Sequence, residues 1–564
     1  MNPLPGVRVT VINPLPTAAY SGMLPGFVAG HYTRDQLEID LVRLGRFAGA
    51  RVIIGAAEGI DIEKREVRIA GQAPVAYDLA SVDVGITSEM PELLGFPEHG
   101  IPAKPLAEFA AKWAAYRTTA KAPKVAVIGA GIAGAELAMA MAHTLKDRSG
   151  KVTLIDKAAA LPGMTDKARA KVLAAMSEAG VDLVESAPIA SVGADGVRLE
   201  DGRLIEAEFV NGAAGARSHD WIATTGLDLV EGYIAVGPTL RSSDPAIFAT
   251  GDCAYMTHAP RPKAGVYAVR QAPILFNNLR SALTEKGRMR SYQPQRDYLK
   301  LVSLGRRSAL ADKFGTAVRG PLLWLWKDRI DRKFMAMLDD LPEMPVPPLP
   351  KEIAAGAVEA LGDKPMCGGC GAKVGRGALR NALASLPATT RKDITPLPGD
   401  DAALLTTGGA QQVITTDHLR SLTNDHALMT RIAAVHALGD IWAMGAKPQA
   451  ATVNVILPRM SAVLQERTMR EIMGAANEVI SCAGAAIVGG HSSMGDELTI
   501  GFTLAGLCDK APITLTLGTL ASTRTLSWAM WLRASNRVSG EIRLFLSATS
   551  SALTTSRCQT EGTQ

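Results

Sequence analysis

Apolar residues form two short runs in the first half of the chain, at residues 125–128 and 152–155. Each run has the length of a fully buried strand, and an alanine-rich stretch that ends near Leu145 lies between them and favours a helix. The turn before this helix carries the pattern Gly-x-Gly-x-x-Gly, and the second run ends at Asp156. A strand, a glycine turn, a helix and a second strand with a terminal acid predict an α/β dinucleotide-binding domain.

The three glycines have separate roles in such a turn. Gly129 permits the tight bend, Gly131 lets the backbone approach a pyrophosphate, and Gly134 lets the helix pack closely on the strand. The amide groups at the start of the helix then face the phosphates, and Asp156 accepts a hydrogen bond from a ribose hydroxyl. A glycine turn without function is the alternative, but the strand, the helix and the acid together favour dinucleotide binding.

Other apolar stretches flank this motif. Residues 7–12 predict a strand, and residues 20–26 form a loop rich in turn residues. A short apolar run that begins near residue 246 delivers Gly251 and Asp252 before a helix-like stretch. A carboxylate held on a glycine turn can accept a hydrogen bond from a ribityl or ribose hydroxyl, whereas the alternative is a plain strand, turn and helix.

An amphipathic segment and a proline-rich segment close the first part of the chain. Residues 320–338 predict a helix that either completes a domain or lies on a membrane or at a quinone entry. Residues 341–350 contain prolines at short intervals and predict an extended, semi-rigid linker. The linker marks a boundary between two units.

Acidic residues recur at the edges of predicted elements after the linker. Asp400 and Asp401 lie in a predicted turn. A β-branched strand delivers Asp417, and an amphipathic helix carries Asp440. A later strand, residues 485–492, is predicted to run into a glycine turn. Each aspartate alone suits a cap or a turn, but together they suit Mg²⁺ that bridges ATP phosphates.

Two cysteines precede these acids. Cys367 and Cys370 form a Cys-x-x-Cys pair with no second pair at matching spacing, which argues against zinc. A nearby ammonium, such as that of Lys373, favours the thiolate, so a nucleophilic or selenium-handling thiol is the better functional hypothesis. A flexible end of the linker is the alternative.

Composition narrows the class of protein. The 564 residues are 47% hydrophobic and 20% charged, which predicts an ordinary globular chain of several domains. The net charge of +5 is small and no dense basic stripe occurs, so nucleic-acid binding is not indicated. Six scattered cysteines favour a reducing cytoplasm, and the sequence shows neither a signal peptide nor an apolar run of about 18 residues.

Residues 7–335 resemble the pyridine-nucleotide-dependent flavoproteins of the type II NADH dehydrogenase and sulfide:quinone reductase kind. The segments that carry the resemblance are Tyr20–Gly26, Gly129–Glu136 and Ala249–Ala254. The resemblance implies FAD at Gly251 and Asp252 and NAD(P)H at the glycine turn, with NADH favoured by Asp156. Such a protein has an earlier strand with its own glycine turn, so we expect a truncated start or incomplete flavin binding. No Cys-x4-Cys pair occurs in this part of the chain, so a dithiol relay is not expected. Cys253 is expected to be a small side chain packed in the interior and not a redox centre.

Residues 366–513 resemble the N-terminal half of selenophosphate synthetase (selenide, water dikinase). The matching segments are Cys370–Lys373, Gly399–Ala403, Thr415–Asp417, His436–Pro448 and Gly489–Ser492. The resemblance implies that Cys370 is the catalytic thiol, that Lys373 is a catalytic cation, and that Asp401 and Asp440 hold Mg²⁺. The implied ATP site consists of Lys373, Asp400, Asp401, Asp417, Asp440, His491, Ser492 and Ser493, the last three across a dimer interface.

The predicted fold class is therefore α/β. It combines an N-terminal two-dinucleotide-binding-domain flavoprotein, Rossmann-like, with a C-terminal α+β half of the selenophosphate synthetase or PurM-like fold. The predicted divisions are residues 1–338 for the oxidoreductase with its NAD part at about 122–215, 339–365 for the linker, 366–513 for the ATP-binding domain and 514–564 for a divergent, disordered tail.

The predicted function is bifunctional. An NADH-dependent flavoprotein oxidoreductase is joined to a dikinase that converts ATP, selenide and water to selenophosphate, AMP and phosphate. The alternative is an NADH:quinone-type dehydrogenase with an inactive, truncated ATP-binding appendage, and a defective nucleotide-binding product is a third reading. FAD, NADH and Mg²⁺ are the expected cofactors, and we expect a cytoplasmic homodimer, with peripheral membrane contact as a further alternative.

Overall fold

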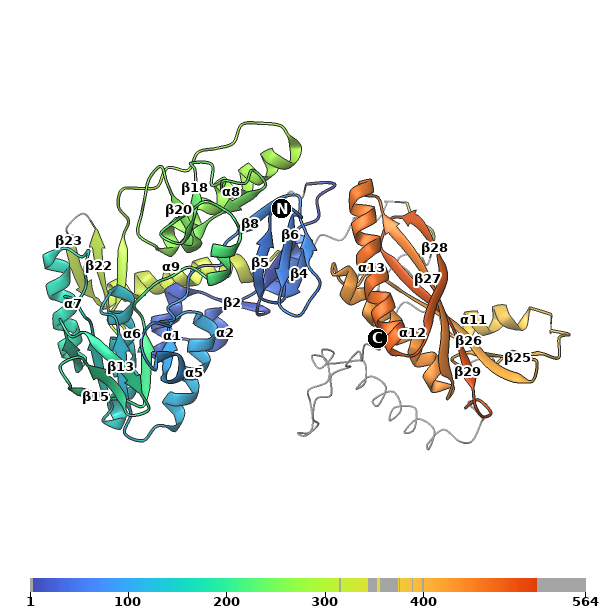
Figure 1. The fold of residues 1–564 in the computed structure, drawn as a ribbon, viewed down its shortest axis with the longest axis horizontal. Coiled ribbons are helices and arrows are strands. Elements are labelled where there is room, and N and C mark those ends of the chain that lie inside the picture. The colour runs from blue at the N-terminus through green and yellow to red at the C-terminus, as the bar shows by residue number, and fades with distance from the viewer. Residues whose placement is uncertain are drawn as a thin grey trace, which may run out of the picture. The chain divides into compact units, whose positions relative to one another are not determined.

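The computed structural model describes residues 4–313, 316–342, 352–355, 374, 376–387, 389–397 and 400–514. The chain divides into two compact units (Figure 1). The N-terminal unit consists of Val11–Phe47 and Ile53–Pro342, and the C-terminal unit consists of Met1–Thr10, Ala48–Val52 and Glu343–Gln564. Helices and strands alternate in both units, which confirms the predicted α/β class.

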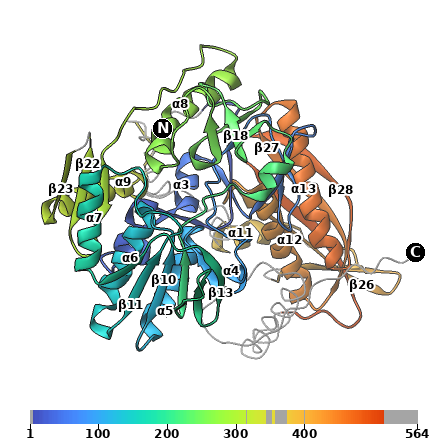
Figure 2. The same ribbon diagram turned by 60° about the vertical axis from the view of Figure 1, so that its left-hand side comes forward.

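A five-stranded parallel sheet organises the N-terminal unit (Figure 2). Its order is β12-β11-β10-β16-β9, and its central strand is the one that enters the glycine turn. Val125 of the central strand pairs with Val152 on one side and Phe209 on the other, so the strand is buried by both neighbours. The strands and the helices beside them are β9 (Gly100–Pro102), α5 (Leu106–Thr119), β10 (Lys124–Ile128), α6 (Ile132–Leu145), β11 (Lys151–Ile155), α7 (Asp166–Glu178), β12 (Val181–Val184) and β16 (Phe209–Gly212).

The second nucleotide motif lies on a smaller parallel pair. Strands β8 (Ala80–Val82) and β19 (Ile247–Ala249) run parallel, and β19 leads through the 3-10 turn η4 (Gly251–Cys253) toward α8 (Gly265–Thr284). The predicted strand over residues 7–12 is observed as β1 (Thr10–Asn13), which forms a two-stranded sheet with β4 (Arg51–Ile54).

Most of the other helices and strands of the first 342 residues are short, and α9 is the long one among them. They are β2 (Thr17–Ala19), α1 (Leu24–Val28), α2 (Arg34–Leu37), β3 (Glu38–Asp40), α3 (Leu41–Ala48), β5 (Ala57–Asp61), β6 (Glu66–Ile69), β7 (Val75–Ala76), α4 (Phe96–His99), β13 (Ile189–Gly193), β14 (Gly196–Leu199), β15 (Leu204–Glu206), β17 (Leu229–Val230), β18 (Tyr233–Val236), β20 (Ala254–Met256), β21 (Lys300–Ser303), β22 (Ala309–Lys313), β23 (Thr316–Gly320) and α9 (Pro321–Asp339).

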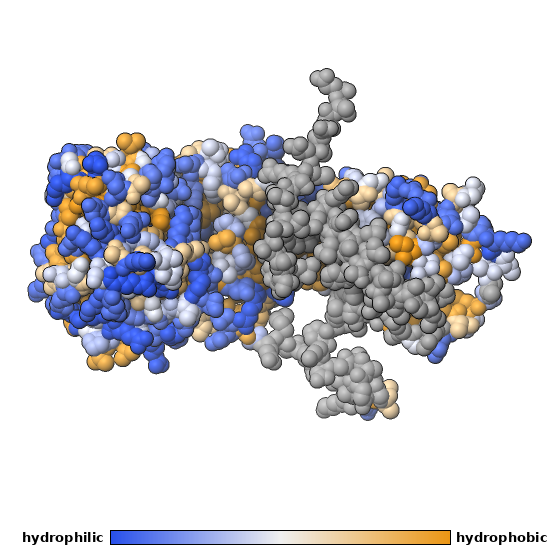
Figure 3. Space-filling view, turned by 90° about the horizontal axis from the view of Figure 1, so that it is seen from below, coloured by the Kyte–Doolittle hydropathy of each residue, from blue (hydrophilic) through white to orange (hydrophobic). Residues whose placement is uncertain are grey.

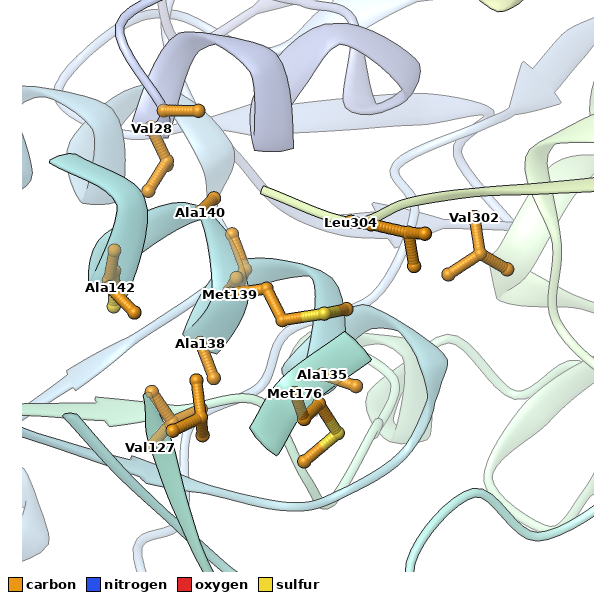
Figure 4. Packing of buried hydrophobic residues seen from close by; sticks show 14 of the residues in the cluster. Val28, Val127, Ala135, Ala138, Met139, Ala140, Ala142, Met176, Val302 and Leu304 are labelled. Carbon is orange, nitrogen blue, oxygen red and sulfur yellow. The ribbon is translucent and has the colours of Figure 1, made fainter. Parts of the chain in front are cut away.

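Helix α6 is the centre of the main hydrophobic core. Its small and unbranched side chains pack against α1, β10 and α7 (Figure 4). Trp113 on α5 is fully buried beside this core, and its Nε1 donates to the carbonyl oxygen of Val28 at 3.1 Å. The alanine-rich composition of α6 lets neighbouring backbones approach, and this close packing explains why its sequence shows no polar face.

Loss of the Trp113 side chain is expected to destabilise the N-terminal unit strongly. Trp113→Ala leaves a large cavity in a packed core, which costs about 3–5 kcal/mol. Trp326→Ala is the matched control because Trp326 is 47% exposed, and a change of about 0.5 kcal/mol or less is expected there. Urea denaturation followed by tryptophan fluorescence and circular dichroism measures both, and equal destabilisation would contradict the packing described here.

The predicted amphipathic helix is observed as α9. Trp324 and Asp331 face inward, with 8% and 4% exposure, whereas Leu322 is 77% exposed. Among the residues that the structure describes, no helix combines the length and the apolarity needed to cross a membrane. Elsewhere on the N-terminal unit, the surface seen in Figure 3 scatters hydrophobic residues among hydrophilic ones, as is ordinary for a folded protein.

A six-stranded mixed sheet organises the C-terminal unit, in the order β24-β25-β26-β29-β27-β28. All neighbours pair antiparallel except β27 and β28, which are parallel. The elements are α11 (Arg376–Ala384), β24 (Ile394–Thr395), β25 (Ala403–Thr407), β26 (Ala410–Arg420), α12 (His426–Ala443), β27 (Lys447–Pro458), α13 (Ala462–Cys482), β28 (Ala486–Gly495) and β29 (Thr499–Cys508).

Helices α12 and α13 cover one face of this sheet (Figure 1). Ile500, Phe502 and Leu504 alternate along β29 and are buried in the same cluster as Leu438 and Ile441 of α12. The period of two along the strand and the apolar stripe of the helix therefore face each other. This packing fixes which side chains of β26 and α12 lie close together.

Two predictions about local structure were wrong. The strand that carries Asp417 does not end there, because β26 continues to Arg420 and pairs with β29 along its whole length. The glycines at 489 and 490 form no turn, because β28 runs through them as a strand paired with β27. In both cases long-range pairing overrides the local turn preference.

Candidate functional sites

The glycine turn between β10 and α6 has the geometry of a phosphate cradle. Gly129 has φ +106°, which favours glycine. A Cβ at Gly134 would lie 1.9 Å from the Gly129 carbonyl oxygen, so only glycine fits where the helix crosses the strand. Gly131 is the N-cap residue of α6, and a Cβ built on it would meet no protein atom within 4 Å. The space beside Gly131 therefore lies at the positive end of a helix and can accept an anion.

Asp156 lies beside this turn, as predicted. Its Oδ2 accepts from the Ala130 amide at 2.6 Å, and its Oδ1 accepts from the Ala158 amide at 2.8 Å. The carboxylate thus joins the end of β11 to the glycine turn, and a carboxylate has further lone pairs for a ribose hydroxyl. The contact with ribose stays a prediction.

The second motif presents a carboxylate on a left-handed turn. Gly251 has φ +69°, and its amide donates to Gln271 Oε1 at 2.8 Å. Asp252 Oδ2 pairs with Lys104 Nζ at 3.1 Å. This donor and acceptor set suits the ribityl and ribose hydroxyls of a flavin dinucleotide. Cys253 beside it is fully buried, and burial raises the pKa of its thiol to about 12, so the thiol packs rather than reacts.

A charged cluster inside the N-terminal unit was not predicted from the sequence. Asp331 on α9 is 4% exposed, pairs with Lys327 Nζ at 2.5 Å and accepts from the Tyr20 hydroxyl at 3.2 Å. Burial raises the pKa of the nearby Glu136 to about 7, while its Oε1 accepts from the Ser303 amide at 2.7 Å. A Lys and an Asp four residues apart on the inward face of α9 are the sequence signal that could have identified it.

Three aspartates and a histidine of the C-terminal unit lie within electrostatic reach of one another. His436 Nε2 on α12 lies 3.0 Å from Asp417 Oδ2 on β26. Asp440, one helical turn further along α12, lies 2.9 Å from the Thr415 hydroxyl. Burial, aided by Asp401 and Asp417, raises the pKa of Asp440 to about 6. The predicted convergence of these acids is therefore observed.

Thr415 contacts two members of this carboxylate cluster, and from the sequence it had no role beyond its place in the matching segment Thr415–Asp417. Its Oγ1 lies 2.9 Å from Asp440 Oδ2 and 3.0 Å from the Asp401 carbonyl oxygen, so one hydroxyl faces two acceptors. A hydroxyl has a single proton to donate. Thr415 Oγ1 is therefore placed to donate to either acceptor, and its hydrogen bond to Asp440 opposes the rise in the pKa of that carboxyl that burial causes.

The donor chemistry of the carboxylate cluster fits Mg²⁺, which prefers oxygen ligands. In the described part of the chain, no group of three or more His, Cys, Asp or Glu side chains is arranged to hold a metal ion. Mg²⁺ commonly uses one or two carboxylates together with waters and substrate phosphates, so a complete protein cage is not required. Asp401 and Asp440 are the residues that would hold it.

Some of the other predicted ATP-site residues lie far from the carboxylate cluster, and others fall outside the described residues. His491, Ser492 and Ser493 lie on β28, and β29 and β27 separate this strand from β26. At about 4.8 Å per strand, roughly 14 Å separates them from Asp417 within one chain. Asp400 lies next to Asp401, and its amide donates to the Leu397 carbonyl oxygen at 3.0 Å. Cys370, Lys373 and the predicted tail after residue 514 lie outside the described residues.

Two family models each match a part of the chain. Residues 5–272 match the family described as "Pyridine nucleotide-disulphide oxidoreductase", and residues 399–508 match "AIR synthase related protein, N-terminal domain". These ranges contain the glycine turn and the carboxylate cluster, respectively. The two matches support the prediction that one chain joins an oxidoreductase-like part to a part from a second family.

The similar proteins fall into two groups, selenide, water dikinases and a reductase, and each covers only a part of this chain. The chain is 35% identical over 163 residues to a selenide, water dikinase of Nitratidesulfovibrio vulgaris, covering 28% of this chain and 46% of that protein. It is 35% identical over 205 residues to a nitric oxide reductase FlRd-NAD(+) reductase of Aeromonas hydrophila, covering 35% of this chain and 50% of that protein. The chain thus spans about half the length or less of these relatives.

Solved structures share the fold of the N-terminal unit. NDH2 from Plasmodium falciparum in complex with NADH has a TM-score of 0.51 at 12% identity, over 59% of this chain and 93% of that one. The sulfide:quinone oxidoreductase from Aquifex aeolicus has a TM-score of 0.50 at 16% identity, over 60% and 86%. At these identities the likeness concerns the fold alone.

Proposed function

We propose that this chain, which joins a pyridine nucleotide-disulphide oxidoreductase domain to an AIR synthase-related N-terminal domain, carries two activities. The first oxidises NADH with bound FAD. The second converts ATP, selenide and water to selenophosphate, AMP and phosphate. The observation that carries the second proposal is the carboxylate cluster, in which Asp401, Asp417 and Asp440 from separate elements converge near Thr415.

In the oxidoreductase reaction the protein binds and orients two dinucleotides. The amides at the start of α6 and the space beside Gly131 bind the NADH pyrophosphate, and Asp156 accepts from its ribose. Asp252, held by Lys104, accepts from a hydroxyl of FAD. FAD supplies the redox chemistry when bound by accepting a hydride. NADH is favoured over NADPH because an acid ends β11.

In the dikinase reaction the protein neutralises and aligns phosphates. Asp401 and Asp440 would hold Mg²⁺, which would balance the charge of the ATP phosphates. Asp440 has to lose its proton before it binds the metal, so Mg²⁺ affinity falls below about pH 6. By resemblance Cys370 and Lys373 act on selenium and phosphate. Because β28 is an edge strand, His491–Ser493 would complete the ATP site of a second copy of the chain.

Thr415→Val is expected to weaken Mg²⁺-dependent ATP binding by about 10- to 100-fold, because the hydroxyl orients Asp440 from behind. Thr415→Ser retains the hydroxyl and is expected to bind nearly as the native protein does. Calorimetric titration with ATP at several Mg²⁺ concentrations measures the effect. Equal affinity of the valine and serine variants for ATP would show that the Thr415 hydroxyl does not contribute to the site.

Two assays on the purified chain test the proposed function. Anaerobic NADH is expected to bleach the flavin absorption, and ATP with selenide is expected to release AMP. Bleaching without AMP release would leave a dehydrogenase with an inactive second half. If the first activity also keeps selenium reduced for the second, oxidised selenium species should accelerate NADH oxidation, and indifference to them would separate the two activities.

A face of α9 supports a proposal about membrane contact. Leu322, Leu325 and Trp326 are 77%, 56% and 47% exposed on successive turns. An apolar face of this kind suits the interface of a lipid bilayer. Co-sedimentation with vesicles tests it, and equal sedimentation of a Leu322→Glu, Leu325→Glu variant would exclude this face.

A further inference from the structure

Helix α8 is amphipathic in the reverse sense. Its buried residues are Tyr267, Gln271 and Asn278. Two of these three are amides, whereas Val269, Phe276 and Leu283 on the outward face are 49%, 55% and 39% exposed. A surface helix normally turns its apolar stripe toward the core and its polar residues toward water. The reversed pattern indicates that the outward face of α8 is a contact surface.

The buried amides fix the orientation of α8 in the N-terminal unit. Gln271 Oε1 accepts from the Gly251 amide at 2.8 Å. Asn278 Nδ2 donates to the carbonyl oxygens of Thr239 and Arg290 at 2.8 and 2.9 Å, and the Arg290 amide donates to Asn278 Oδ1 at 2.7 Å. Turning the apolar face inward would break all of these hydrogen bonds and leave buried polar groups unpaired. The apolar face therefore stays in solvent unless another molecule covers it.

The apolar residues have the spacing of a helix-pairing seam. Val269, Phe276 and Leu283 are seven residues apart, and the exposed Ala272 and the half-buried Leu279 lie between them. Apolar residues at the first and fourth positions of a seven-residue repeat form the line along which two helices pack. From Val269 to Leu283 this α8 seam is about 21 Å long at 1.5 Å per residue. Its shape therefore suits a second helix.

Basic residues accumulate in α8 and in the segment that follows it. Residues 265–296 contain six basic residues and one acidic residue, a net charge of +5 that equals the net charge of the whole chain. The basic residues are Arg270, Arg280, Lys286, Arg288, Arg290 and Arg296. They are too widely spaced to form a dense stripe in the sequence, but Asn278 holds the backbone of Arg290 against α8 and brings the later arginines back to this helix.

Much of this charge is not compensated within the described part of the chain. There, the exposed Arg270, Arg288 and Arg290 form no ion pair. The Arg280 guanidinium carbon lies over the Phe276 ring, 5.4 Å from its centroid, so a cation borders the seam directly. A second copy of α8 would bring its own arginines to the seam and be repelled, whereas a helix with acidic flanks would be attracted.

Pro273 distinguishes a protein partner from a lipid surface. It is exposed beside the seam and has no amide hydrogen, so the Val269 carbonyl oxygen lacks the usual donor four residues later. An acyl chain cannot donate to this carbonyl, and covering it with lipid costs free energy. A partner protein has side chains that can donate to it.

We propose that the outward face of α8 docks an acidic amphipathic helix of a partner protein. The apolar residues of that helix pack on the α8 seam. Its Asp and Glu residues pair with the arginines of residues 265–296, because a guanidinium binds a carboxylate through two parallel hydrogen bonds. This surface adds a protein partner to the small-molecule substrates of the oxidoreductase part.

Fluorescence anisotropy with two labelled peptides tests the proposal on the full chain. The first peptide has about three heptads with Leu at the seam positions and Glu at the flanking positions, where like charges prevent self-pairing. The second has the same composition in scrambled order. We expect the first to bind at least about tenfold more tightly and to weaken as salt is added. Equal affinities would reveal attraction by charge alone and overturn the proposal, as would the absence of binding.

Variants locate the docking face. Phe276→Ala is expected to raise the dissociation constant of the first peptide at least about tenfold. Leu94→Ala is the matched control, because Leu94 is 74% exposed and lies outside α8, and native affinity is expected there. Arg270→Gln is expected to weaken binding and to reduce its salt dependence. Equal peptide affinity of Phe276→Ala and Leu94→Ala overturns the proposal.

The other occupants of this face give different results. Sedimentation with phosphatidylglycerol vesicles that is lost in Phe276→Ala would assign the face to lipid. Self-association in analytical ultracentrifugation that is lost in the same variant would assign it to a second copy of the chain. Either result overturns the proposal, whereas a monomer that leaves the vesicles in solution and binds the first peptide supports it.

Discussion

Replacing Gly131 by valine is expected to abolish NADH binding without disturbing the fold. The backbone at this position has φ −69° and ψ 178°, which any residue can adopt, and a Cβ would meet no protein atom within 4 Å. The added methyl groups therefore occupy only the space assigned to the pyrophosphate. We expect the dissociation constant for NADH to rise at least about a hundredfold while the melting temperature changes by only about 2 °C.

Gly134→Ala is the informative contrast. Its Cβ would lie 1.9 Å from the Gly129 carbonyl oxygen, so the turn has to open and the protein loses about 1–3 kcal/mol of stability together with NADH binding. Quenching of tryptophan fluorescence by NADH and thermal unfolding separate the two variants. Native affinity in Gly131→Val would show that no ligand occupies the turn.

Replacing Asp440 by asparagine is expected to reduce AMP release from ATP and selenide at least about a hundredfold. The variant keeps the shape of the side chain but removes the charge that holds Mg²⁺. Asp496→Asn is the matched control, because this exposed carboxylate lies between β28 and β29, away from the cluster, and near-native release is expected. The assay is AMP formation under saturating Mg²⁺ and ATP.

The pH dependence of the free energy of unfolding tests the environment of Asp440 independently of the activity assay. The folded-state pKa of Asp440 is raised to about 6, above its usual value, so the folded protein holds this proton more tightly than the unfolded chain. Its contribution to stability is therefore complete in acid and declines as the pH rises through about 6. Asp440→Asn lacks this decline, so its stability relative to the native chain should rise from pH 4 to pH 7.5. A constant difference would contradict the buried environment described here.

Local geometry explains which parts of the sites were predictable from the sequence. The turn with Gly129, Gly131 and Gly134 is determined by contacts within a few residues, and Asp156 follows because it ends the adjacent parallel strand. The turn needs glycine at these positions because of its backbone conformation and close contacts, so the glycine pattern alone predicts the turn. The same holds for Gly251, whose left-handed turn presents Asp252.

Pairing over long distances explains the rest. Gly489 and Gly490 suggested a turn, but hydrogen bonding to β27 keeps them in a strand and moves His491 to the far edge of the sheet. Thr415 joins Asp401 to Asp440 only because α12 packs on β26.

The most direct test of the account is a pair of equilibrium titrations, with NADH and with Mg²⁺·ATP, on the native chain, Gly131→Val and Asp440→Asn. We predict that the native chain binds both nucleotides, that the first variant loses only NADH, and that the second loses only Mg²⁺-dependent ATP. If either variant kept both ligands, or if a single substitution removed both from a folded chain, the assignment of two separate nucleotide sites would be wrong.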